Sequence, residues 1–291
     1  MLFEPFANNE FLRLSLVAGV LVAVTCAIAG TFVVLRGLAF IGDALSHGVL
    51  PGIATAMLWG ISGVVGAAVG SLVMMAGVSV VSRRFRLSGD TAIGLLFVGM
   101  LALGVMITSR SRTFFGDLSR ILFGELFGVN SRDLIVQFVA LVIVAAVAYI
   151  ARRPFLLLCV DEGLAKTSGF SSRLFHNLML MIVAITVIAS FQTVGTLLVL
   201  GMLIAPAATG ALFARRISTV MLIASLVGSI STYVGLLISY HFDLAAGASI
   251  VLTTVLIFAV SATYSEIKKT IAGNSHDEHE HPHAHADSHI R

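Results

Sequence analysis

The stretch LRLSLVAGVLVAVTCAIAGTFVVL occupies residues 12–35 and carries a single charged side chain, Arg13. A helix that crosses the hydrocarbon core of a bilayer needs about 20 mostly apolar residues, so this stretch is long enough and apolar enough to span a membrane. Similar runs recur along the chain, and the segments predicted to span are 12–35, 38–59, 62–82, 91–109, 133–151, 174–193, 195–214, 218–239 and 246–264. The runs are continuous rather than alternating, which favours helices over the strands of a membrane barrel. The sequence therefore predicts an all-α, polytopic membrane helix bundle of about nine transmembrane helices.

The composition of the chain agrees with a membrane location. Of its 291 residues, 58% are hydrophobic and 11% are charged, and the mean hydropathy is +1.01. A soluble domain has roughly 25% charged residues and keeps a polar exterior, which this composition does not supply. The net charge of +3 gives no reason to expect a nucleic-acid partner. Cys26 and Cys159 lie in different apolar stretches, and we expect both to be small core residues without a disulfide.

Glycine is frequent, at 27 residues, and small residues recur at four-residue spacing, as in Gly66 and Gly70. Such positions let helices pack closely in lipid. Glycine is also common in membrane helices in general. The spacing alone therefore leaves open whether this pair lies at a helix contact.

The distribution of lysine and arginine predicts the orientation, because cytoplasmic loops are enriched in both. One side of the predicted bundle would carry Arg36, Arg83, Arg84, Arg86, Arg152, Arg153, Lys166, Arg173, Arg215, Arg216, Lys268 and Lys269. The other side would carry Arg13, Arg110, Arg112, Arg120 and Arg132. We expect the first side to be cytoplasmic, with the N-terminus outside and the C-terminus inside. Segment 110–132 is ambiguous in this scheme, and it could form a short interfacial helix or hide a further span.

The chain is predicted to have two parts, a transmembrane domain over residues 1–270 and a tail over residues 271–291. The end of the tail reads NSHDEHEHPHAHADSHIR (274–291) and has no apolar content around which to fold, so we expect it to be disordered and cytoplasmic. Its imidazoles could bind zinc, nickel or copper loosely. The tail could buffer metal, sense it, or do neither; its candidate ligands are His276, His279, His281, His283, His285 and His289.

Asp43 and His47 share the segment 38–59, and their i, i+4 spacing places both on one helix face. An ionisable group at membrane depth is costly unless it faces a cavity, a partner or an ion. A carboxylate and an imidazole together form a reasonable half-site for zinc or manganese. The alternative is a pair that only satisfies itself between helices. Pro51 follows in the same segment and could kink the helix beside a pathway, or serve packing alone.

Other polar residues lie at the ends of the predicted spans. His241 and Asp243 could cap the outer mouth of a pathway or be ordinary interfacial loop residues. Asp90 opens its span and is interpreted as a helix N-cap. The loop 153–172 is predicted to form a short helix, which is either a docking surface on the inner face or a plain connector.

The sequence lacks several motifs that are typical of nucleotide-binding and catalytic sites. It contains no phosphate-binding loop of the form GxxxxGK[ST], no nucleophile elbow and no HExxH pattern. The chain therefore has no visible ATP site or hydrolytic site and is not expected to be an enzyme.

Several blocks together resemble the permease subunits of bacterial ABC importers for zinc and manganese. They are GLAFIGDALSHGVLPGIA (37–54), SGDTAIGLLF (88–97), LFGELFGV (122–129), DEGLAKTSGFS (161–171), TVGTLLVLGMLIAPAATG (193–210) and YHFDLAAGASIVL (240–252). The resemblance implies a type II ABC importer-like homodimer in the bacterial cytoplasmic membrane. Two ATP-binding subunits would dock inside, and an external metal-binding protein would deliver the ion. No cofactor would be bound permanently, because Zn²⁺ or Mn²⁺ would be cargo.

The resemblance also assigns roles to residues. Asp43 and His47 match positions that line the metal route, and His241 and Asp243 match a less uniform region. Block 161–171 matches the loop that engages the ATPase, with Asp161, Glu162, Ala165 and Gly169 as docking residues.

The predicted function is therefore uptake of a divalent transition metal by alternating access. Imidazole and the histidine-rich tail place zinc first and manganese second. The alternatives are an ATPase-independent channel or secondary transporter, and a membrane-anchored metal sensor.

Overall fold

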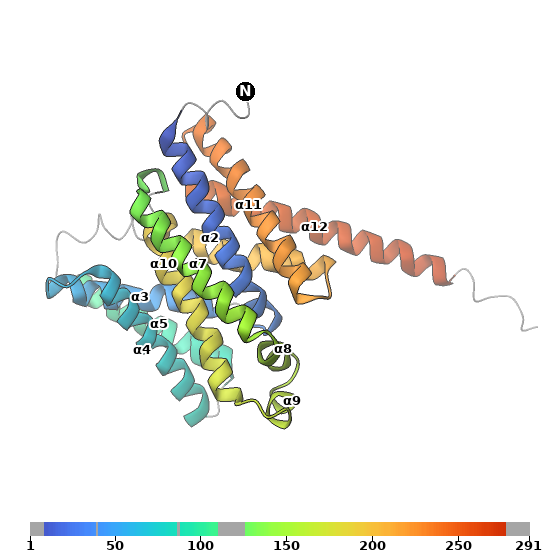
Figure 1. Ribbon diagram of the computed structural model, residues 1–291, viewed down its shortest axis with the longest axis horizontal. Helices are drawn as coiled ribbons and strands as arrows, with labels where there is room; N and C mark the ends of the chain where they lie inside the picture. The colour runs from blue at the N-terminus through green and yellow to red at the C-terminus, as the bar shows by residue number, and fades with distance from the viewer. Residues whose placement is uncertain (1–8, 39, 86–87, 110–125, 278–291) are drawn as a thin grey trace, which may run out of the picture.

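The structure of the protein is a computed structural model that describes residues 9–38, 40–85, 88–109 and 126–277. The described part is almost entirely helical (Figure 1). Its elements are α2 (Glu10–Leu35), α3 (Phe40–Leu58), α4 (Gly63–Arg84), α5 (Gly89–Thr108), the 3-10 helix η1 (Leu126–Gly128), α7 (Ser131–Ile150), α8 (Arg152–Val160), α9 (Glu162–Thr167), α10 (Ser172–Phe213), α11 (Ile217–Phe242) and α12 (Ala246–Asp277). Each predicted span corresponds to one of these helices or to part of one, which confirms the all-α prediction.

Membrane-spanning length is reached by most of these helices. Within the described residues, six helices are long and apolar enough to cross a bilayer, and two shorter apolar helices cover Thr91–Ile107 and Leu198–Phe213. Helix α3 is not among them, because Asp43, His47 and Pro51 interrupt its apolar sequence. With α3, these helices account for all the predicted segments.

Helix α10 joins two segments that were predicted as separate spans, 174–193 and 195–214. Gly195, with φ 77° and ψ 159°, is the one residue with non-helical backbone angles inside it. Only glycine adopts this conformation readily, so the chain can change direction there without a loop. The hydroxyl of Thr193 donates to the carbonyl of Ser190 at 3.0 Å beside this kink. The two halves of α10 run in different directions in Figure 1.

Helix α2 lies at the centre of the main bundle, against α7, α10 and α11. It approaches α10 so closely that a Cβ atom at Gly30 would lie 1.9 Å from the carbonyl oxygen of Leu203. The buried hydroxyls of Thr25 and Thr31 are satisfied within the helix, because they donate to the carbonyls of Leu21 and Ala27 at 2.7 and 2.6 Å. Such internal pairing is needed at membrane depth, where water is absent.

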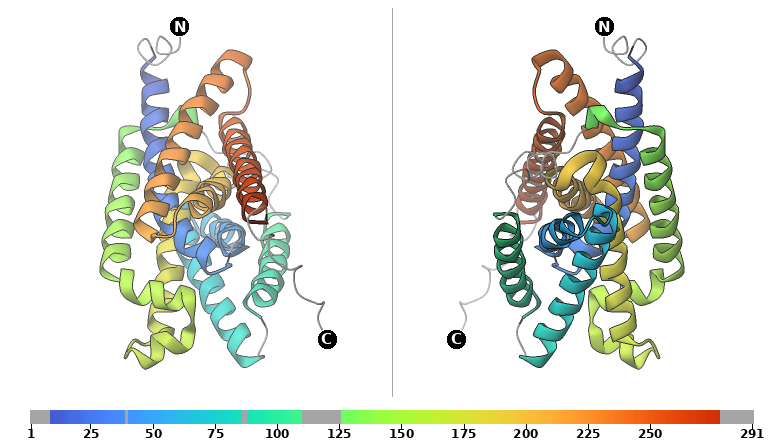
Figure 2. Two further views of the ribbon diagram at one scale, coloured as in Figure 1. Left: turned by 90° about the vertical axis from the view of Figure 1, so that its right-hand side faces the viewer. Right: turned by 90° about the vertical axis from the view of Figure 1, so that its left-hand side faces the viewer.

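A second group of helices, α3, α4 and α5, packs beside α10. Figure 2 shows α3 nearly end-on next to the second half of α10. A Cβ atom at Gly52 of α3 would lie 2.1 Å from the carbonyl oxygen of Gly66. A Cβ atom at Gly70 would lie 2.6 Å from that of Gly48. Gly66 and Gly70 therefore lie at a tight helix contact, which settles the question that their spacing left open.

The two ends of the bundle carry different elements (Figure 1). The start of α2 and the end of α11 lie at one end. The end of α4, the start of α10, and α8 and α9 lie at the other. The loop 153–172, predicted as one short helix, contains two, because Asp161 adopts extended angles (φ −159°, ψ 135°) between them.

Two predictions fall partly or wholly outside the residues that the structure describes. Helix α12 continues to Asp277, beyond residue 271 where the predicted tail begins, and residues 278–291 lie outside the description. Most of the ambiguous segment 110–132 also lies outside it, since the structure describes this segment only from residue 126 onward. The interfacial helix and the disordered tail therefore stay predictions.

Candidate functional site

Asp43 and His47 lie on one face in the first half of α3, as their spacing predicted. His47 Nε2 is 3.4 Å from Asp43 Oδ1. A strong charge-assisted hydrogen bond is about 2.7–2.9 Å long. The separation of Asp43 and His47 is longer, so their contact with each other does not prevent these atoms from binding a ligand. The side chains of His47 and Asp43 keep 22% and 30% of their surface exposed. Neither side chain is fully enclosed by its own chain.

Three neighbouring helices hold α3 at the level of this pair. The His47 ring packs edge-on against Phe97 of α5, with ring centroids 5.0 Å apart. A Cβ atom at Gly48 would lie 2.8 Å from the Cβ atom of Met74 in α4, and one at Gly42 would lie 2.6 Å from Leu203 Cδ2 in α10. The position of the pair is thus set by α4, α5 and α10 as well as by α3.

Pro51 lies inside α3, which stays helical from Phe40 to Leu58. Proline has no N–H group, so residue 51 cannot donate the helical hydrogen bond to the carbonyl oxygen of His47, four residues earlier. The hydroxyl of Thr55 donates to the carbonyls of Pro51 and Gly52 at 2.7 and 2.9 Å. The proline therefore leaves a backbone oxygen beside the Asp43–His47 pair without its usual helical donor.

His241 and Asp243 lie at the end of α11 and are exposed. His241 Nδ1 is 2.9 Å from the carbonyl oxygen of Leu237. Asp243 ends the helix in the left-handed conformation, with φ 52°. Across the residues that the structure describes, no three His, Cys, Asp or Glu side chains gather in a metal-binding arrangement. The structure thus does not bring these two residues together with Asp43 and His47.

The predicted docking loop is a capped turn at the end of the bundle (Figure 1). The Asp161 side chain accepts hydrogen bonds from the backbone N–H groups of Gly163 and Leu164 and so caps α9. Gly169, with φ 82°, follows the helix. Ala165 is fully buried, so it supports the turn from within, whereas Asp161 and Gly169 are exposed. The side chain of Glu162 lies outside the description.

Two other predictions concern helix ends. Helix α5 is capped by Ser88, whose hydroxyl oxygen accepts from Thr91 N–H at 3.2 Å. Asp90 is the second residue of the helix, and the prediction that it is the N-cap was wrong because the N-cap is Ser88, two residues earlier. The side chains of His276, His279, His281, His283, His285 and His289 are not part of the description, so their role stays a prediction.

Sequence reasoning missed one buried polar group, Gln137 of α7, which is 1% exposed. Its Nε2 donates to Thr25 Oγ1 of α2 at 3.3 Å, and its Oε1 accepts from Ser190 Oγ of α10 at 3.3 Å. The available signal was an amide side chain within an apolar span, since such residues usually bond across helices. Gln137 thus links three helices near the Gly195 kink.

A polytopic helix bundle with an open carboxylate–imidazole pair in one membrane helix defines a membrane transport protein rather than an enzyme. The model of the ABC 3 transport family matches residues 8–265, and the chain belongs to this family.

Known relatives cover most of the chain. It is 34% identical to the manganese transport system membrane protein MntC of Listeria innocua, over 91% of this chain and 95% of that protein. It is 36% identical to the chelated iron transport system membrane protein YfeD of Yersinia pestis, over 92% of this chain and 90% of that protein. The solved structure of PsaBC from Streptococcus pneumoniae in complex with Fab has a TM-score of 0.80 and 32% identity, covering 89% of this chain and 94% of that one.

These findings confirm the resemblance to ABC importer permeases, and the chain is a multi-pass permease subunit of the inner membrane. The names of these relatives describe membrane proteins of transport systems, not enzymes. These names specify manganese or chelated iron and do not mention zinc, so the predicted order of zinc before manganese is not supported.

Proposed function

We propose that the chain is the permease subunit of an ATP-driven importer of a divalent first-row transition metal, with manganese ahead of zinc. The observation that carries this proposal is the Asp43–His47 pair, which is partly exposed on one face of α3, with His47 Nε2 3.4 Å from Asp43 Oδ1. Intramembrane ionisable residues usually mark an ion pathway, because keeping them in lipid without a function is costly. The names of the relatives support manganese over zinc.

One chain supplies too few ligands for a stable metal site. Zinc takes about four ligands and manganese favours about six, largely oxygen. Asp43 and His47 supply two, and the described residues add no third side chain of a metal-binding type. In a homodimer, two copies facing each other would double the set, and the carbonyl oxygen of His47 could add a ligand or hold water. Incomplete coordination suits transport, because the ion must leave as readily as it enters.

The ends of the bundle support the placement of the partners. Arg84, Arg153, Lys166 and Arg173 lie at the end of α4, in α8 and α9, and at the start of α10, which share one end of the molecule. The positive-inside rule makes this end cytoplasmic, with the N-terminus outside. The exposed Asp161–Gly169 turn would then face the ATP-binding subunits, and an external metal-binding protein would dock at the opposite end.

The test is uptake of radiolabelled manganese, iron and zinc by the complex with its own ATP-binding subunit, reconstituted in liposomes. Loss of an outer-sphere partner alone costs about 10–100-fold in metal affinity, so Asp43→Asn or His47→Ala should lower uptake by at least about tenfold. The paired controls are Asp243→Asn and His241→Gln, which should keep uptake. Size-exclusion chromatography shows whether each variant still forms the folded dimer.

Two outcomes of this experiment would contradict the proposal. Uptake that continues without ATP would indicate a channel or secondary transporter. Normal uptake by both α3 variants would reject the site. Removal of residues 274–291 should leave transport intact, whereas a metal sensor would lose its function.

A further inference from the structure

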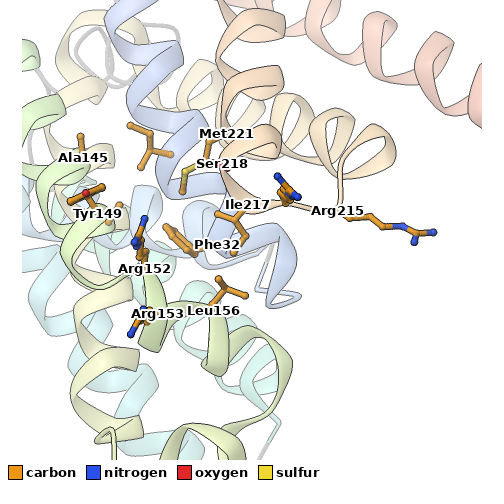
Figure 3. Close-up of a pocket in the computed structure, with 13 residues that line it drawn as sticks. Phe32, Ala145, Tyr149, Arg152, Arg153, Leu156, Arg215, Ile217, Ser218 and Met221 are labelled. Carbon is orange, nitrogen blue, oxygen red and sulfur yellow. The ribbon is translucent and has the colours of Figure 1, made fainter. Parts of the chain in front are cut away.

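A cavity of about 750 Å³ lies between α2, α7, α8 and α11, away from Asp43 and His47 (Figure 3). Its volume is within the range of small-molecule sites, roughly 300–1,000 Å³. Ile28 of α2, Leu156 of α8 and Met221 of α11 form apolar walls, and the fully buried Phe32 lies behind them. Phe32 lies between the two sides in Figure 3. The metal-transport proposal makes no use of this cavity.

Four arginines line the cavity, and none of its described lining residues is acidic. The side chain of Arg215 extends away from Arg152 and Arg153 in Figure 3. Arg152 and Arg153 begin α8 on one side, and Arg215 and Arg216 precede α11 on the other (Figure 3). The guanidinium of Arg152 lies over the Tyr149 ring, 5.3 Å from its centroid. A cavity with basic side chains on two of its sides and no acidic lining residue favours a bound anion.

The helix ends at the same place add to this preference. Helix α11 begins beside the cavity, and its N-terminus leaves backbone N–H groups without helical partners. The start of α8 adds little, because Ala151 is also the C-cap of α7 and the opposite dipole ends meet there. The partial positive charge at a helix N-terminus also favours an anion, and phosphate groups commonly bind there.

The cavity lies at the level where the spans end. Helix α7 ends at Ile150, α11 begins at Ile217 and α2 ends at Leu35. Tyr149 and Ile150 are 71% and 81% exposed beside it. A surface with exposed apolar groups at this level faces lipid, and its arginines lie where the hydrocarbon meets water.

We propose that this cavity binds one anionic phospholipid of the cytoplasmic leaflet. The headgroup phosphate contacts arginines from both sides of the cavity, in α8 and just before α11, and the acyl chains lie along Ile28, Leu156 and Met221. Basic pockets between transmembrane helices on the cytoplasmic side recognise anionic headgroups in this way. A soluble phosphate would need the arginines but not the apolar walls. An acidic protein surface would not fill a cavity that opens between spans.

The experiment adds defined lipids to the full-length chain purified in detergent and counts bound lipid by native mass spectrometry. Phosphatidylglycerol should bind and phosphatidylcholine should not. Each basic residue near a membrane surface contributes about fivefold in affinity, so the pair Arg152→Gln and Arg153→Gln should weaken phosphatidylglycerol binding by about 25-fold. The matched control is Arg84→Gln with Arg173→Gln, which removes two exposed charges from the same end but outside the cavity.

Two further measurements separate the possible ligands. Ala145 lines the cavity, so Ala145→Phe should fill it and lower lipid binding while all four arginines remain. Arg152→Lys with Arg153→Lys should retain most of the binding, which excludes loss of folding as the cause. The proposal is overturned if the glutamine pair binds phosphatidylglycerol like the control, if phosphatidylcholine binds equally, or if inorganic phosphate displaces the lipid and Ala145→Phe has no effect.

Discussion

Gly52 offers the sharpest test of how α3 is held. Its Cβ position lies 2.1 Å from the carbonyl oxygen of Gly66 and 2.9 Å from the Cα atom of Gly70. Normal carbon–oxygen contacts are about 3.3–3.6 Å, so Gly52→Ala should force the α3 and α4 backbones apart by roughly 1 Å. Both obstacles are backbone atoms, so no side chain can move aside to relieve the clash.

The magnitude follows from two opposing effects. Overpacking costs about 1–3 kcal/mol, and this clash belongs at the upper end of that range. Alanine regains about 1 kcal/mol of helix propensity over glycine. The net loss should be about 2 kcal/mol, which lowers the melting temperature of a chain of this size by about 4–8 °C.

The assay is thermal unfolding of the purified chain in detergent at one fixed scan rate, because unfolding of such proteins is often irreversible. Gly63→Ala is the matched control on the same helix pair, since its Cβ atom would lie 3.7 Å from Ile53 Cγ2, an ordinary contact. Its midpoint should stay within about 2 °C of the original chain. The reasoning is refuted if Gly52→Ala has the same melting temperature as the original chain, or if Gly63→Ala lowers the melting temperature as much as Gly52→Ala does. Either result would show that the close approach of α3 and α4 does not hold the site.

Three other predictions use the same purified chain. Gln137→Leu removes the amide that joins Thr25 and Ser190, and it should cost about 0.6–1.7 kcal/mol, seen as a lower melting temperature; an unchanged midpoint would mean that the network contributes nothing. Asp161→Ala removes the cap of α9 at a cost of about 0.5–2 kcal/mol, so it should reduce co-purification of the ATP-binding subunit. Asp161→Asn keeps a capping oxygen and should preserve the complex, and equal loss in both variants would point to the charge instead. Burial raises the pKa of the Cys159 thiol, so less thiolate is present at pH 7.5 and maleimide labelling should be much slower than in denaturant; equal rates would show an exposed thiol.

The local sequence pattern was enough to predict the helices and to predict that the two candidate metal ligands of α3 lie on one helix face. In lipid, each spanning helix must satisfy its backbone within itself, so its position depends on its own run of apolar residues. Asp43 and His47 are four residues apart, and the geometry of one helix fixes their relation. The break near residue 194 was also predictable, but its form was not, because a glycine kink and a loop can begin with the same residues.

Contacts between helices could not be predicted in this way. The spacing of Gly66 and Gly70 did not indicate which residues they would contact. Only the packing of α3 on α4 shows that these residues are Gly48 and Gly52. Gln137 gave no indication of Thr25 or Ser190 as its partners.

By itself, then, the sequence determined that this chain is a helical membrane protein with a carboxylate and an imidazole on one face of a span. The tertiary structure alone decided which helices hold that pair, and it alone gathered the arginines of α8 and of the α10–α11 loop around one cavity. The physical reason is distance along the chain: hydropathy and helical spacing act within about 20 residues. Packing joins residues that are remote in sequence through shape and charge that no local run of residues contains.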